Sequence, residues 1–143
     1  MTRKIDSYST PIPMAISPSA EALGLTLGGP AADVLRIDDT IIVRLELAGA
    51  RAEDLRVWAG AGEVVVRGMR RDPLGDHPRR IDQMEIAFGP FERSITLPEP
   101  VLADEAQARL YLGLLQIELP VAHPRHEPVS QSIVALIVLS ESS

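Results

Sequence analysis

The chain has 143 residues, of which 45% are hydrophobic and 3% aromatic, and its formal net charge at pH 7 is −6. This length allows one domain with an aliphatic core and some additional chain, since domains commonly hold about 100–150 residues. The absence of cysteine excludes disulfides, thiol catalysis and cysteine-ligated zinc, and the acidic balance argues against binding nucleic acid through its phosphates.

Residues 1–32 are rich in Ser, Pro, Gly and Ala, and nothing in them supports a hydrophobic core. We expect a flexible N-terminal arm here, with at most one helical turn at Glu21–Leu27. Arg3 and Lys4 are followed by Asp6 and by other polar residues rather than by an apolar run, so no signal peptide is predicted. Together with the lack of cysteine, this favours a cytoplasmic protein.

Residues 33–120 have the pattern of a folded β domain. In Ile41–Leu47, apolar side chains alternate with Arg44 and Glu46, which is typical of a strand with one buried face. Few segments show a helical period, and turns separate the short apolar runs. Strands are predicted at Asp33–Ile37, Ile41–Leu47, Leu55–Trp58, Val64–Met69, Ile81–Ile86, Phe91–Leu97, Ala106–Leu112 and Leu114–Leu119. Such a series indicates an all-β, immunoglobulin-like antiparallel β-sandwich.

Residues 121–143 form a C-terminal extension in which a polar linker with Pro124 and Pro128 precedes the apolar run Ile133–Leu139. This run is the longest in the sequence, yet it is far shorter than the roughly 20 residues of a membrane-spanning helix, so no membrane span is predicted. An isolated apolar strand in water is an aggregation hazard. We therefore expect it to dock on a sheet edge or in a groove, which can belong to another chain.

No catalytic or cofactor motif stands out. The sequence has no Gly-x-Ser-x-Gly elbow, and Gly60-x-Gly62 lacks the third glycine and the helix of a phosphate-binding loop. His123 and His126 have a metal-like spacing, but two histidines in a Pro-rich linker are typical of a solvated tail. We predict no enzyme activity, no cofactor and no metal site.

A basic cluster lies in and before the polar segment that follows Val64–Met69. Its members are Arg67, Arg70, Arg71, Arg79 and Arg80. They suit a nucleic-acid surface. The alternative is a solvated loop, whose charges are partly matched by Asp72, Asp76 and Asp82, or a dimer contact. Arginine pairs well with carboxylates, so we favour the second interpretation and predict no nucleic-acid partner.

Four blocks carry a family resemblance. The first block is Leu45–Gly49, which is followed by the acidic pair in Glu53–Leu55, and the second is Val64–Arg67. The third is Glu85–Pro98, which contains Phe-Gly-Pro-Phe-Glu-Arg and ends in Leu-Pro. The fourth is Ala108–Pro120, and the four have the expected order and spacing. Together they resemble the small heat-shock protein family, whose domain is an alpha-crystallin-type sandwich. The resemblance covers residues 33–120.

The resemblance implies an ATP-independent chaperone that binds non-native client proteins and assembles with itself into dimers and larger homo-oligomers. The alternative is a co-chaperone or adaptor sandwich of the p23 type, which binds one defined protein partner.

The resemblance also implies three sites. A dimer would form by exchange of a strand near Arg80–Ala87, with an interface of Arg80, Ile81, Asp82, Met84, Glu85 and Arg93. A short Ile-x-Ile-like tail anchor has overlapping candidates, Val134/Leu136, Leu136/Val138 and Ile137/Leu139, of which Val134, Leu136 and Val138 are the predicted set. The wall of its groove is expected at Leu114, Ile117 and Leu119. Arg93 shares a strand face with Phe91 and Ile95, so we expect it to point inward and to need a carboxylate or carbonyl partner.

Overall fold

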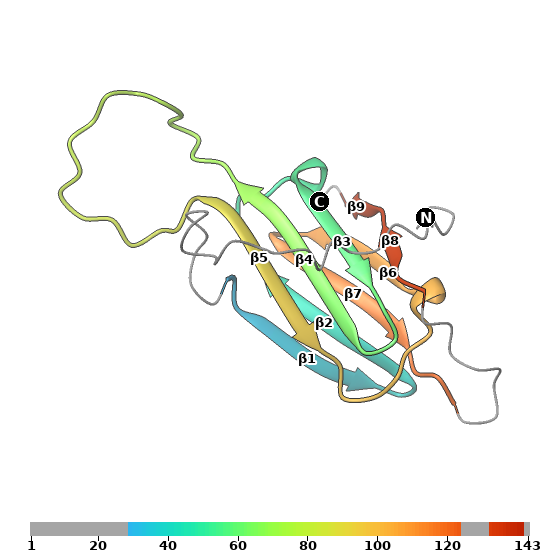
Figure 1. The fold of residues 1–143 in the computed structure, drawn as a ribbon. Coiled ribbons are helices and arrows are strands. Elements are labelled where there is room, and N and C mark those ends of the chain that lie inside the picture. Colours follow the sequence, from blue (N-terminus) through green and yellow to red (C-terminus); the bar gives the residue numbers. More distant parts are fainter. Residues whose placement is uncertain (1–28, 124–131, 142–143) are drawn as a thin grey trace.

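Two β-sheets packed face to face make up the protein (Figure 1), in a computed structural model that describes residues 29–123 and 132–141. One sheet has the strand order β1-β2-β7-β6-β9 and the other β5-β4-β3-β8. The strands are β1 Ala32–Ile37, β2 Thr40–Glu46, β3 Leu55–Ala59, β4 Glu63–Arg70, β5 Gly89–Thr96, β6 Gln107–Tyr111, β7 Leu114–Pro120, β8 Val134–Leu136 and β9 Val138–Ser140. Two short 3-10 turns, η1 Ala52–Asp54 and η2 Ala103–Glu105, complete the described elements. The predicted all-β sandwich is confirmed.

Aliphatic side chains fill the space between the sheets, as the composition predicts. In β2, Ile41, Val43 and Leu45 are fully buried in the core cluster, while Arg44 faces outward and pairs with Asp33 of β1. Phe91 is the aromatic member of the core. Because β-branched and leucine side chains carry no polar atoms, this core needs no internal hydrogen bonds.

Tight hairpins join the strands of the larger sheet. The β6–β7 turn has two residues, Leu112 and Gly113, both at positive φ (52° and 76°). Positive φ suits glycine but is unusual for a leucine. The Gly113 carbonyl accepts the Leu47 N–H at 2.7 Å, and a Cβ added to Gly113 would lie 3.0 Å from the Cα of Ala48. A glycine is therefore required where this turn packs against the segment after β2.

The apolar tail is divided between the two sheets. β8 runs antiparallel to β3, whereas β9 runs parallel to β6, and Ile137 lies between them. The single strand predicted at Ile133–Leu139 is thus two short strands. The tail lies beside β3 and β6 at one side of the sandwich (Figure 1) and is hydrogen-bonded to both layers. It is docked on its own chain.

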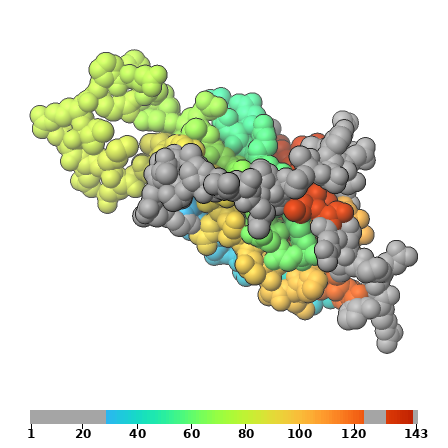
Figure 2. All heavy atoms as spheres, viewed as in Figure 1, coloured from blue at the N-terminus to red at the C-terminus, as the bar shows by residue number. Residues whose placement is uncertain are grey.

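The segment between β4 and β5 stands away from the sandwich as a long loop (Figures 1 and 2). The strand predicted at Ile81–Ile86 is absent, and this expectation was wrong for the single chain. A β-strand forms by pairing with a neighbour, and the described residues offer this segment no paired edge. The predicted N-terminal arm lies almost entirely outside the described residues, so its boundary at residue 32 stays a prediction.

Candidate functional site

The tail binds through two alternate side chains of β8. Val134 and Leu136 are 4% and 8% exposed and belong to the core cluster, and they lie opposite Ala59 and Val57 of β3. Val138 of β9 is partly buried and packs against the same cluster. Of the three overlapping pairs considered from sequence, Val134/Leu136 is the most deeply inserted.

The groove that receives the tail has β3 and β6 as its walls, not β7. The predicted wall residues Leu114, Ile117 and Leu119 all lie on β7, which already pairs with β2 on one side and with β6 on the other. Ile117 and Leu119 are fully buried in the core, and Leu114 is exposed beside the β6–β7 turn. A docking strand needs free backbone groups at an edge. β3 and β6 offer such edges and β7 does not, so the predicted wall is corrected to β3 and β6.

Trp58 marks the outer side of this groove. It is the only tryptophan of the chain, and it lies directly opposite Ala135 of β8. The guanidinium carbon of Arg67 lies 5.7 Å from the centre of its ring, and Arg67 also pairs with Glu92 at 2.6 Å. The indole is therefore held in place by a cation–π contact, and its environment depends on whether β8 is bound.

The distal end of the tail makes polar contacts. The N–H of Glu141 donates to the carbonyl of Leu110 at 3.0 Å, and the Glu141 carboxylate lies 3.3 Å from the Arg109 guanidinium. Arg109 also pairs with Glu118 of β7 at 3.3 Å. The tail thus has an apolar attachment at β3 and a polar one at β6.

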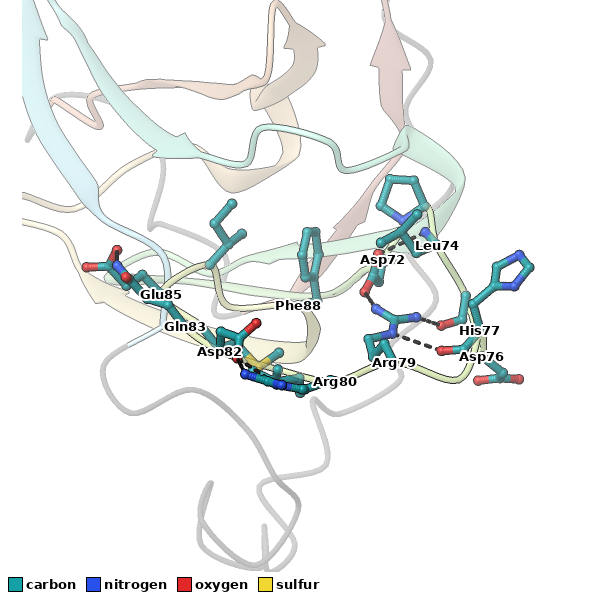
Figure 3. A pocket seen from close by; sticks show the side chains of 15 residues that line it. Asp72, Leu74, Asp76, His77, Arg79, Arg80, Asp82, Gln83, Glu85 and Phe88 are labelled. Atoms are coloured by element: carbon teal, nitrogen blue, oxygen red, sulfur yellow. Dashed lines mark hydrogen bonds and ion pairs between the residues drawn. The ribbon is translucent and has the colours of Figure 1, made fainter.

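Five of the six predicted interface residues lie in the projecting loop. Ile81 and Met84 are 59% and 65% exposed, Arg80 pairs with Asp82 inside the loop, and the amide of Gln83 donates to Glu85. Figure 3 shows these side chains around the open hollow that the loop encloses. The loop therefore presents large apolar side chains to water, which is unusual for an unpartnered segment.

The base of the loop is held by its own hydrogen bonds. Arg79 pairs with Asp72 at 2.6 Å and donates to the carbonyls of Gly75 and His77 (Figure 3). Asp72 accepts the Leu74 N–H at 2.9 Å, and this bond, followed by that from Arg79, lowers the pKa of the Asp72 carboxyl. Residues 72–79 thus form a hydrogen-bonded base from which the rest of the loop extends.

Arg93, the sixth predicted residue, lies apart from the others on β5. It is opposite Val66, whose side chain is in the core, and it is only partly buried. Its guanidinium donates to the carbonyl of Pro30 at 3.3 Å. Of the two expected kinds of partner, a carboxylate or a carbonyl, the structure shows a carbonyl, which belongs to the segment that leads into β1. The role of Arg93 in a dimer interface stays a prediction.

An apolar strand edge was not singled out from the sequence. β1 is the outermost strand of its sheet, and Val34, Leu35 and Ile37 are 41%, 38% and 61% exposed. Successive strand residues point to opposite faces, so β1 has apolar side chains exposed on both faces. The signal was visible in Val34-Leu35-x-Ile37, but only the strand order shows that, among the described residues, β1 pairs on one side alone.

The arginines of the basic cluster have partners within the chain. Arg67, Arg79 and Arg80 pair with Glu92, Asp72 and Asp82. Arg71 makes two 2.9 Å bonds to Asp54, which lower the pKa of that carboxyl, and Arg70 donates to the Ala48 carbonyl. These contacts match the interpretation of a solvated, charge-matched loop.

Within residues 29–123 and 132–141, no three His, Cys, Asp or Glu side chains lie close enough to hold a metal ion. The same residues contain no helix with the length and apolar character needed to cross a membrane.

The amino-acid sequence is similar to those of known heat shock and spore proteins. Heat shock protein 16 of Schizosaccharomyces pombe is 33% identical over 93 residues, which are 64% of this chain and 65% of that protein. Spore protein SP21 of Stigmatella aurantiaca is also 33% identical, over 64% of this chain and 54% of its own length. The chain thus spans less than two thirds of these relatives.

Solved structures of heat shock proteins have a similar fold. Heat shock protein 16.0 from Schizosaccharomyces pombe has a TM-score of 0.59 and 29% identity, over 70% of this chain and 93% of that one. The hspA structure from Xanthomonas axonopodis has a TM-score of 0.58 and 25% identity, over 64% and 92%. The model of the Hsp20/alpha crystallin family matches residues 33–135, which run from β1 through β7 and end within the first tail strand, β8. The chain therefore belongs to the Hsp20/alpha-crystallin family of small heat-shock proteins.

Proposed function

We propose that this protein is an ATP-independent holdase, which captures non-native proteins on apolar surface that its own tail and its own assembly otherwise cover. The observation that carries the proposal is the apolar tail seated across the edges of β3 and β6. Membership of a family of chaperones supports it, and so does the absence of any nucleotide-binding motif in the sequence.

The tail contact buries few side chains, which suits a segment that can detach and rebind. It buries two aliphatic side chains, Val134 and Leu136, and full burial of such a side chain stabilises by about 1.5–3 kcal/mol. The conformational entropy that is lost when the tail becomes ordered opposes this gain. When the tail leaves, one edge of β3 and one edge of β6 become free, and extended segments of a client can pair there.

Dimer formation is the second part of the proposal. Loop residues 80–88 expose the apolar side chains of Ile81, Met84 and Ile86 between charged ones and pair with no strand of the described residues, which also leave the outer edge of the apolar strand β1 unpaired. A second copy brings these two surfaces together, so that Ile81, Met84 and their neighbours form the missing strand along β1. Such an exchange covers a bare edge and supplies main-chain hydrogen bonds. Arg93 lies on β5, outside the exchanged segment.

A client-aggregation assay tests the holdase. The purified protein should suppress heat-induced aggregation of a model client at a near-stoichiometric ratio, and added ATP should change nothing. Native mass spectrometry of the same sample should show dimers or larger assemblies. Failure to suppress aggregation at several-fold excess would overturn the proposal, and a monomeric protein would instead favour the p23-type adaptor.

A further inference from the structure

The two attachments of the tail differ in kind, and the polar one is built for recognition. β9 pairs with β6 through three residues, and its side chains are only partly buried. The contacts that follow it belong to Glu141, whose N–H donates to Leu110 and whose carboxylate lies 3.3 Å from Arg109. A cation on the sandwich thus lies beside an anion of the tail.

Arg109 is also held in position by contacts that do not involve the tail. Its second guanidinium nitrogen lies 3.3 and 3.4 Å from the two carboxylate oxygens of Glu118 on the neighbouring strand β7. Glu118 in turn accepts a hydrogen bond of 3.1 Å from the amide of Gln116. These groups line one outer face of β6 and β7, and a side chain fixed in this way loses less rotamer freedom on binding.

We infer that Arg109 is a specificity-determining residue of the tail groove, which selects extended segments that carry a carboxylate at a set distance from the apolar anchor. The spacing is that of Val134, Leu136 and Glu141: two aliphatic residues two positions apart, then an acidic residue five positions after the second. The occupant with this chemistry is the tail itself, in its own subunit or in a second copy. The inference rests on the proposed function only in requiring that the tail leaves its groove.

A charge-reversal cycle in the full-length protein tests the contact. Arg109→Glu and Glu141→Arg should each raise the hydrogen-exchange rate of the tail amides about two- to fivefold, as expected for loss of an exposed ion pair. The double variant should bring the rate back toward the parental value, but short of it because the new carboxylate at position 109 also faces Glu118, and high salt should reduce the differences. Arg44→Glu is the matched control, because Arg44 pairs with Asp33 on the same sheet at similar exposure but away from the tail, and it should leave tail exchange unchanged.

Selection between segments is tested on a full-length Leu136→Asp variant, whose own tail is released because a carboxylate cannot occupy the apolar site. Circular dichroism verifies its fold, and Trp58 emission reports peptide binding, since Trp58 lies opposite Ala135. A peptide of residues 132–143 should bind about two- to fivefold more tightly than the same peptide with Glu141→Lys. Adding Arg109→Glu to the protein should invert this preference.

Equal affinity of the two peptides, no binding of either, or a double variant whose tail amides exchange no more slowly than those of Arg109→Glu alone would overturn the inference. These outcomes are independent of the aggregation assay: a protein that fails to protect clients but shows the inverted peptide preference refutes the holdase and leaves the role of Arg109 intact.

Discussion

Gly68 shows how closely single residues of the sandwich are packed. It lies on β4, where an added Cβ would be 2.6 Å from the ring of Phe91 and 2.7 Å from a methyl group of Leu55. Overpacking of a core commonly costs about 1–3 kcal/mol, so Gly68→Ala should lower the free energy of unfolding by about that amount in urea titration. Gly62→Ala is the control, since its Cβ would meet nothing within 4 Å. Equal stability of both variants would contradict this packing.

At the scale of elements, the hydrogen-bonded base of the loop, residues 72–79, should loosen in acid. The Asp72 carboxyl has a pKa below its usual value of 3.8 because it accepts the Leu74 N–H and pairs with Arg79. A depressed pKa stabilises this base fully above pH 3.8, and the contribution is lost as the pH falls through the lowered pKa. The Leu74 amide proton should therefore titrate with a midpoint below 3.8 in NMR, and Asp72→Asn should abolish the titration. A midpoint above 3.8 would show that the contacts of Asp72 with the Leu74 N–H and with Arg79 are absent in solution.

At the scale of the whole molecule, the tail should govern assembly. Deleting Ser132–Ser143 removes β8 and β9 and frees one edge of each sheet. Size-exclusion chromatography should then show a shift from larger oligomers toward dimers if tails also dock on a second copy, because that contact is lost while the loop and β1 remain. The β-sheet circular dichroism should persist, because the other seven strands keep their pairing. Unchanged oligomers would mean that the tail serves only its own subunit, as in the single chain.

Local pattern was enough to predict most strands and the core. β2, β4 and β7 were found from sequence within two residues of their ends, because alternating Ile, Val and Leu side chains must bury one face whatever surrounds them. The resemblance over residues 33–120 also led to the family that the comparison shows. The tail was recognised as a strand that needs a partner, because an apolar run behind a polar linker has no local way to leave water.

Only the tertiary structure decided which edges are free. Whether β3, β6 or β7 receives the tail depends on the strand order, and no local pattern contains that order. The same holds for the segment at Ile81–Ile86, whose strand-like sequence stays unpaired because pairing is a property of two segments rather than one. Arg109 and Glu141 lie 32 positions apart in sequence, and their contact follows from the parallel register of β6 and β9. Which side chains are buried can be predicted from the residues themselves. Which strands pair, and therefore where the tail groove lies, depends on which segments the folded chain places side by side.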